Sequence, residues 1–183
     1  MNIVDSNEQQ IQDALTQGCA ALAAAIGLLA LLGWLFRLPL LTSLGTNLIP
    51  MAPSTALLFI LLGAAVFARS RLGESLTVRR IAFFVGVLGV LVALVLLSTS
   101  AQGIYLEAER LGFPVIATLA QVPVGHMSPL TSLSFLLVSL SFLALRPAPK
   151  SKPWRQVAAL GAAFLVTAAN FVLVLAYFFG LPL

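Results

Sequence analysis

Five long stretches of the chain consist almost entirely of apolar residues. They extend from about residue 18 to 36, 52 to 68, 81 to 100, 128 to 145 and 157 to 179. None alternates apolar and polar residues as the strands of a membrane barrel do. A helix needs about 20 residues to cross the hydrocarbon core of a bilayer. Because a backbone in lipid must satisfy its own hydrogen bonds, the pattern predicts an all-α, polytopic transmembrane helical bundle with five spans.

The segment that precedes the first apolar stretch is different in character. Residues 1–17 are polar and contain Asp5, Glu8 and Asp13, with apolar residues scattered at roughly helical spacing. Both a short helix on the membrane surface and a disordered tail fit this pattern. The chain therefore divides into a polar N-terminal segment, 1–17, and a transmembrane domain, 18–183.

Composition excludes an ordinary soluble domain. The chain is 60% hydrophobic and only 9% charged, whereas a soluble domain carries roughly 25% charged residues. So few charges would leave large apolar patches in water. The net charge of +4 does not indicate nucleic-acid binding, because the basic residues form two short clusters between apolar stretches. The expected partner is the lipid bilayer, with no nucleic acid.

The basic residues also predict an orientation. Eight of them flank the second and fourth connections: Arg69, Arg71, Arg79, Arg80, Arg146, Lys150, Lys152 and Arg155. The opposite connections contain only Arg37 and Arg110. Lysine and arginine concentrate in cytoplasmic loops. We therefore expect a cytoplasmic N-terminus, and Leu183 on the outer side.

The chain repeats itself at an offset of 76 residues. The segment MAPSTALLFILLGAAVFA, from Met51, aligns without gaps with MSPLTSLSFLLVSLSFLA, from Met127. A second match aligns residues 33–40 with 176–183, and both segments end in Leu-Pro-Leu. The repeating unit is a helix pair, and its copies cross in the same sense, as in a parallel repeat. The fifth helix resembles half of a third unit, so we hypothesise a fragment or shortened relative of a longer protein.

The two related helix starts are the first candidate site. Pro53 with Thr55, and Pro129 with Thr131, lie in the first turns of their helices. Proline suits a helix start because its missing amide proton has no partner there anyway. The favoured interpretation is helix initiation at the outer interface. The alternative is a ligand site, because helix N-termini favour anions.

His126 and Asn170 are two further candidates. We expect His126, the only histidine, to be solvated at the outer interface. The alternatives are a metal ligand together with Met127 and a pH sensor. Asn170 lies deep in the fifth span, where asparagine usually bonds to a neighbouring helix. A ligand or proton path is the alternative for Asn170.

The longest outer loop contains three charged residues, Glu107, Glu109 and Arg110. Two carboxylates two positions apart do not share a helix face, which disfavours a paired acid and base. We expect a solvated loop in which Glu107 or Glu109 pairs with Arg110. If a ligand binds outside, this loop is the best candidate, because loops often carry binding residues.

Residue types that carry catalysis are scarce. The sequence contains no nucleotide-binding loop, nucleophile triad or zinc spacing. We expect no catalytic residues, no metal, no cofactor and no enzyme activity in this chain. The predicted spans also lack Asp, Glu, Lys and Arg, which argues against an ion pump or proton-coupled transporter.

The segments IPMAPSTALLFILLGAA, from Ile49, and GHMSPLTSLSFLLVSLSFLAL, from Gly125, resemble the N-terminal multi-pass membrane regions of bacterial sensor proteins. In those proteins, PAS, histidine kinase or diguanylate cyclase domains follow the membrane region. The resemblance implies a non-catalytic sensory input module of a signal-transduction protein, or a fragment of one, in the bacterial inner membrane. The chain lacks the soluble output domains. The alternative is a small structural or assembly subunit of an inner-membrane complex. Either function implies a homo-oligomer or a membrane-protein partner.

Overall fold

A computed structural model describes residues 3–38, 41–42, 50–73, 75–104, 106–113, 118–119, 122–123, 125–145 and 153–178. Its helices are α1 (Ile3–Leu35), α3 (Pro53–Leu72), α4 (Leu76–Ala101), α5 (Pro129–Ala144) and α6 (Pro153–Phe178). The connection from α4 to α5 contains a 3-10 turn, η1 (Glu107–Arg110), and a two-residue antiparallel pair, β1 (Thr118–Leu119) with β2 (Val122–Pro123). The predicted all-α class is confirmed, with this pair as a minor addition.

Three segments of the described helices are long and apolar enough to cross a membrane. They are Gln10–Leu35 in α1, Pro53–Leu72, which is all of α3, and Leu76–Ala101, which is all of α4. The apolar helix α5 is shorter, at 16 residues. Length and composition therefore support a membrane protein.

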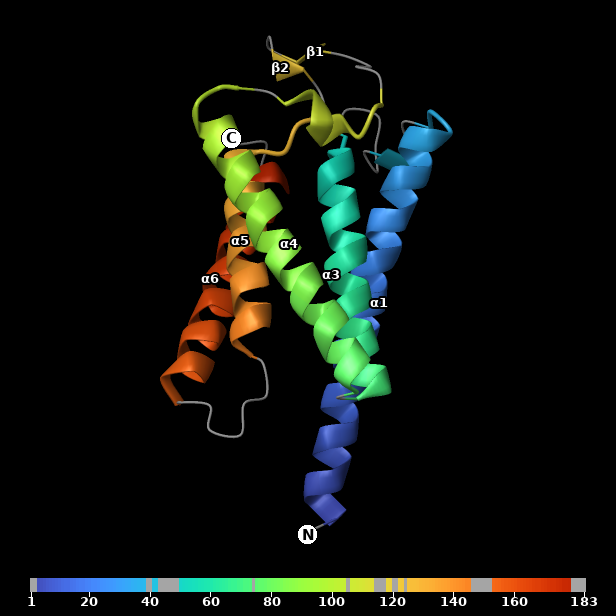
Figure 1. The fold of residues 1–183 in the computed structure, drawn as a ribbon, viewed down its shortest axis with the longest axis vertical. Helices are drawn as coiled ribbons and strands as arrows, with labels where there is room; N and C mark the ends of the chain where they lie inside the picture. The colour runs from blue at the N-terminus through green and yellow to red at the C-terminus, as the bar shows by residue number, and fades with distance from the viewer. Residues whose placement is uncertain are drawn as a thin grey trace.

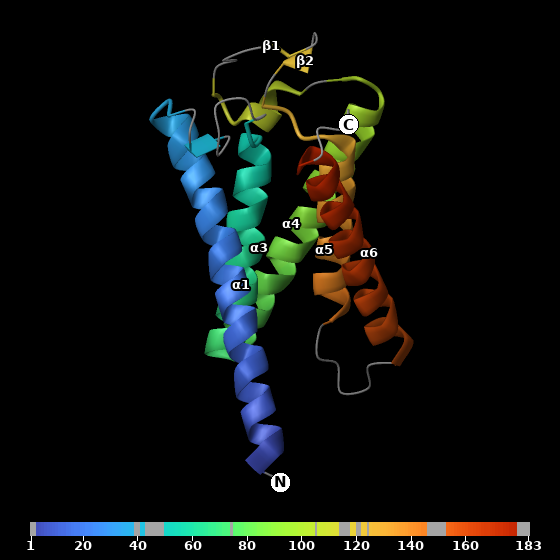
Figure 2. The same ribbon diagram turned by 180° about the vertical axis from the view of Figure 1, so that it is seen from behind.

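The helices run alternately up and down along one direction (Figures 1 and 2). α1 packs along α3, and α4 packs mainly along α5 while its first turns contact α3. α6 lies against α5. The described residues between 102 and 123, which include η1, β1 and β2, cover the end of the bundle where α3 and α5 begin. We call this region the cap, and we call the opposite end, which contains the short connection between α3 and α4, the turn end.

α1 includes the polar N-terminal segment. It is one continuous helix from Ile3, so the structure has neither a separate surface helix nor a tail over residues 3–17. Its 33 residues correspond to about 50 Å at 1.5 Å per residue, against about 30 Å for the hydrocarbon core. The first turns of α1 accordingly project past the other helices at the turn end (Figure 1).

α1 with α3, and α4 with α5, form two helix pairs. Glycines set how closely the two helices of each pair approach one another. A Cβ atom added at Gly27 of α1 would lie 2.5 Å from the carbonyl oxygen of Ala56 in α3. In the second pair, a Cβ atom added at Gly89 of α4 would lie 2.5 Å from Ser139 Oγ in α5. Small residues allow such close packing between membrane helices. Close packing in both helix pairs therefore requires a glycine at the point of contact.

A small apolar core joins the two pairs below the cap. Its buried members are Ala52, Leu58, Leu62, Ala93, Leu96, Met127 and Phe135. Phe59 of α3 meets Phe135 of α5 edge to face, with 5.2 Å between ring centroids. At the turn end, Arg69 of α3 donates to the carbonyl oxygen of Leu145, at 2.8 Å. The pairs are thus linked at both ends of the bundle.

Candidate functional site at the cap

The turn η1 separates two glutamates into opposite environments. α4 ends at Ala101, and Gly103, with φ +69°, redirects the chain into the cap. A 3-10 turn has three residues per turn, so residues two apart point in different directions. The Glu107 side chain is 92% exposed and pairs with Arg110 at 3.4 Å. The Glu109 side chain points inward and is only 6% exposed.

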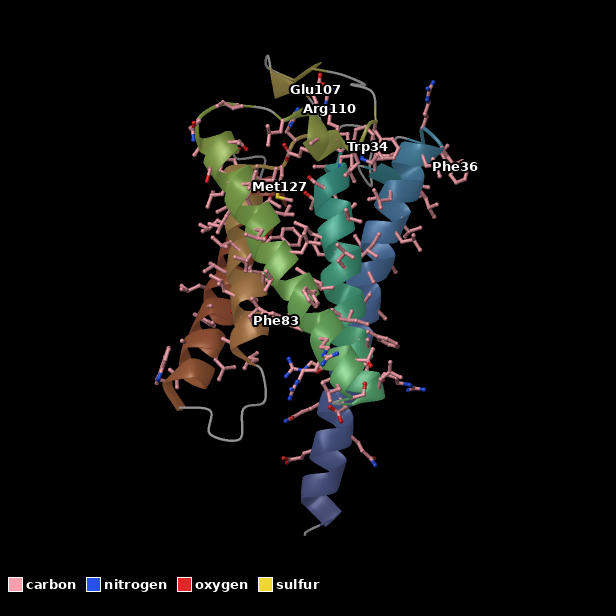
Figure 3. The ribbon with its side chains drawn as sticks, in the orientation of Figure 1. Trp34, Phe36, Phe83, Glu107, Arg110 and Met127 are labelled. Atoms are coloured by element: carbon pink, nitrogen blue, oxygen red, sulfur yellow. The ribbon has the colours of Figure 1, made fainter. Side chains whose placement is uncertain are left out.

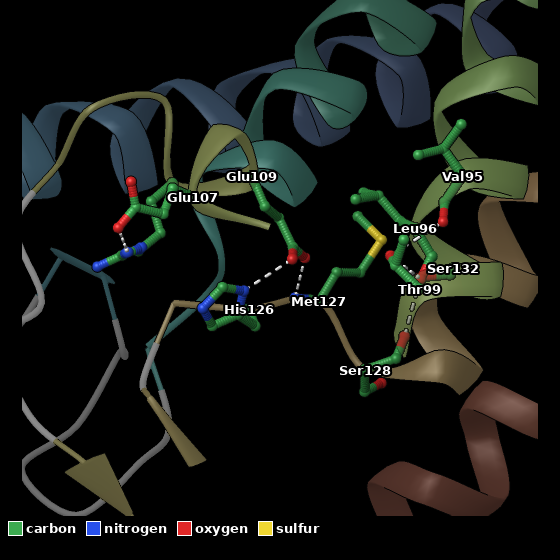
Figure 4. Close-up of polar contacts among 10 residues, drawn as sticks. Val95, Leu96, Thr99, Glu107, Glu109, His126, Met127, Ser128 and Ser132 are labelled. Atoms are coloured by element: carbon green, nitrogen blue, oxygen red, sulfur yellow. Dashed lines mark hydrogen bonds and ion pairs between the residues drawn. The ribbon is translucent and has the colours of Figure 1, made fainter. Parts of the chain in front are cut away.

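Glu109 is satisfied by two donors from the residues that lead into α5 (Figure 4). Its Oε2 atom lies 2.8 Å from Nδ1 of His126, whose side chain is 5% exposed. Its Oε1 atom accepts a hydrogen bond from the backbone amide of Met127. Buried carboxylates are tolerated when donors surround them. Glu109 therefore joins the cap directly to the start of α5.

This arrangement corrects two expectations. The prediction of a solvated His126 is wrong, because the ring is buried against Glu109. The expectation that both glutamates are solvated is wrong for Glu109, whereas the pairing of Glu107 with Arg110 is confirmed. His126 is buried because the chain turns at Gly125, just before it. The φ angle of Gly125 is +106°, a value that favours glycine, and the turn brings the His126 ring to Glu109.

The geometry does not favour a metal ligated by His126 and Met127. The two side chains lie on opposite sides of the backbone in Figure 4, and Met127 is 3% exposed in the apolar core. Over the described residues, no group of three or more His, Cys, Asp or Glu side chains is placed to hold a metal.

The two helix starts differ in how their amides are satisfied. At α5, Ser128 Oγ accepts from the amide of Thr131 at 3.1 Å and contacts Thr131 Oγ1 at 2.8 Å, while Pro129 is exposed. At α3, Pro53 and Thr55 are buried, and the preceding Ala52 offers no side-chain cap. The Glu109 carboxylate, which accepts from the Met127 amide, places a negative group just before the start of α5.

Trp34 connects α1 to the same region, and we did not predict this role. Its Nε1 atom donates to the carbonyl oxygen of Met51 at 2.8 Å, and its ring centroid lies 5.9 Å from that of Phe113 in the cap. The side chain is buried, and Gly125 lies beside its ring. Trp34, Glu107, Arg110 and Met127 all lie at the cap end in Figure 3. The signal in the sequence was a tryptophan at the end of an apolar stretch, which also fits an interface anchor.

Asn170 lies apart from the cap, on α6. Its Nδ2 atom donates to the carbonyl oxygen of Val166 at 2.8 Å and to Ser134 Oγ of α5 at 3.4 Å. Asn170 therefore links two helices, as the packing interpretation expects. The six candidate residues do not converge: two lie at the start of α3, three at the start of α5 and one on α6.

Comparison with other proteins adds no identification. The sequence matches no protein-family model, no curated protein and no solved structure. The resemblance to bacterial sensor regions therefore rests on the two helix-start motifs alone.

Proposed function

We propose that the chain is a membrane-embedded sensory input module of a bacterial signal-transduction protein, non-catalytic by itself. The observation that supports this function best is the buried contact of Glu109 with His126 and Met127. This contact is a polar connection, among the described residues, between the cap and α5, which extends to the opposite end of the bundle. A signal that changes the cap can therefore act on α5.

The energetics favour two discrete states over gradual deformation. Removing one partner of a buried, hydrogen-bonded charge leaves the other partner uncompensated and is strongly destabilising. The cap is consequently either docked, with Glu109 paired, or displaced, with Glu109 in water. A sensor needs two such states whose relative populations depend on the signal.

The proposal includes five spans built from parallel helix-pair repeats. α3 and α5 both begin with a proline at the first helical positions, and these prolines are 76 residues apart. Two contacts between the pairs also join positions separated by 76, namely Phe59 with Phe135 and Arg69 with Leu145. Equivalent residues meet in this way when two copies face each other across a common axis.

We place the module in the inner membrane, with the N-terminus cytoplasmic and the cap outside. The arginines of the α3–α4 connection and the N-terminus of α1 lie at the same end of the bundle, the turn end. Loops rich in arginine remain on the cytoplasmic side.

Coupling between the two ends is testable by electron paramagnetic resonance. Spin labels at Leu72→Cys and Leu145→Cys, in a Cys19→Ser background, report the distance between α3 and α5 at the turn end. Both sites are exposed. Glu109→Gln should shift this distance by about 1–2 Å, the size of typical helix shifts, whereas Glu107→Gln should leave it unchanged. An identical distance in both variants would contradict a sensory role for the cap.

A structural subunit of an inner-membrane complex is the second candidate. Among the described helices, α6 packs mainly against α5, and large apolar side chains on it are exposed, including Phe164, at 72%. Such a face suits either lipid or a partner protein. Stoichiometric co-purification with a membrane complex would favour this function, as would a fixed distance between the spin labels.

A further inference from the structure

The turn end carries three exposed arginines from the end of α3 and the beginning of α4. Arg71 lies in the last turn of α3, and Arg79 and Arg80 lie near the start of α4. All three side chains are exposed, and none forms an ion pair with a carboxylate of the described residues. We call these three residues the arginine surface. The neighbouring Arg69 differs, because it is bonded to Leu145 and lies over the ring of Phe142 at 5.8 Å.

The local electrostatics call for an anion at the arginine surface. The N-terminal end of a helix carries a partial positive charge, so cations near it are unfavourable. Nevertheless, Arg79 and Arg80 lie near this end of α4, and the first turn of α4 contains no acidic residue. A negative group that binds near Arg79 and Arg80 offsets both their mutual repulsion and their unfavourable interaction with the helix end.

The position of the surface indicates which anion it meets. The 20 residues of α3 give a length of about 30 Å, which equals the thickness of the hydrocarbon core. With the start of α3 at one interface, the arginine surface lies at headgroup depth on the other side. Exposed apolar side chains adjoin it: Leu72 at 66%, Leu76 at 61% and Phe84 at 69%.

A surface with arginines above exposed apolar residues is complementary to an amphiphile with an anionic head. Arginine binds phosphate oxygens through paired N–H donors, and leucine and phenylalanine suit acyl chains. We propose that the arginine surface binds the headgroups of anionic phospholipids in the leaflet on the turn side. This contact fixes the depth of the α3–α4 connection in the membrane.

Native mass spectrometry of the detergent-solubilised full chain tests the proposal. The protein is titrated with phosphatidylglycerol and, separately, with phosphatidylcholine that has the same acyl chains. We expect preferential retention of phosphatidylglycerol. The Arg79→Gln/Arg80→Gln double variant should lower its apparent affinity by about fivefold or more and leave phosphatidylcholine unchanged. The Arg79→Lys/Arg80→Lys variant, which keeps both charges, should retain most of the binding.

Control variants and competitors make the result decisive. Arg37→Gln removes an exposed charge beyond the end of α1 at the cap end and should not change lipid retention. Circular dichroism verifies that each variant is folded, and the lysine variant keeps the test valid if the glutamine variant unfolds. Equal retention of the two lipids, or undiminished phosphatidylglycerol binding in the glutamine variant, would overturn the proposal. Displacement of the lipid by millimolar inorganic phosphate would also overturn it, because the surface would then bind free phosphate.

Discussion

At the scale of single residues, two identical side chains two positions apart have opposite roles. Glu107 is solvated and belongs to a surface ion pair, whereas Glu109 is buried and holds the cap to α5. Exposed ion pairs contribute little to stability because water and salt screen them. A buried carboxylate with two donors contributes much more, since removing it leaves both donors without an acceptor.

The two glutamates therefore form a matched pair of substitutions. Glu109→Gln should lower the free energy of unfolding by about 1–3 kcal/mol, because an amide replaces one acceptor oxygen with a donor that faces His126 or the Met127 amide. Glu107→Gln should change it by less than about 0.5 kcal/mol. Denaturant titration in mild detergent, followed by tryptophan fluorescence, measures both. Equal effects of the two substitutions would show that Glu109 does not hold the cap.

Trp34 offers a second test at this scale. Trp34→Phe keeps an aromatic ring but leaves the carbonyl oxygen of Met51 without its indole donor. We expect a loss of about 1–2 kcal/mol in unfolding free energy. Trp154→Phe is the control, because that side chain is 64% exposed, and it should be nearly neutral. The thermal unfolding midpoints of the two variants, measured in the same detergent, test whether the indole hydrogen bond of Trp34 stabilises the fold. Equal midpoints would show that it does not.

The sequence predicted that Glu107 or Glu109 pairs with Arg110, and the structure has the Glu107 pair, but the contact of Glu109 with His126 was not predicted. The first contact joins residues three apart in one turn, where local spacing determines which side chains meet. The second joins residues 17 apart and depends on the backbone at Gly125, on η1 and on the way the cap folds back on the bundle. Local patterns contain no information about such a return of the chain.

At the scale of helices, the apolar pattern locates the stretches but not the true helix ends. α4 begins at Leu76, where Ser75 Oγ accepts from the amide of Val78, five residues before the apolar stretch expected from residue 81. α1 likewise begins at Ile3 and includes the polar segment. Hydropathy reports which residues prefer lipid, whereas capping and backbone hydrogen bonding determine where a helix starts.

The close approach of α1 and α3 yields a prediction for two glycines of the same helix. Gly27→Ala places a methyl group 2.5 Å from the Ala56 carbonyl oxygen, so the helices must separate, at about 1–3 kcal/mol. Gly18→Ala meets nothing within 4 Å and should be neutral or slightly stabilising. Thermal unfolding in detergent distinguishes them. A neutral Gly27→Ala would mean that α1 and α3 are not packed this closely.

At the scale of the whole molecule, the fold is two helix pairs joined by a small core, with α6 alongside. The sequence anticipated the helical class, since it follows from local composition, whereas the internal repeat stays a prediction. It did not anticipate that α4 contacts α3 with its first turns and α5 along most of its length, because such crossings depend on how distant side chains pack. Nor did it indicate that the cap is bonded to the bundle.

We propose that these helices span a bilayer, with the cap on the outside and the arginine-rich turn inside. Cysteine labelling tests it most directly, using a membrane-impermeant maleimide on a Cys19→Ser background. We predict that Ala108→Cys, exposed in the cap, is labelled in intact bacterial cells, and that Thr77→Cys, exposed at the turn end, is labelled only after the membranes are broken. Labelling of both sites to the same extent in intact cells, or of Thr77→Cys alone, would contradict the account.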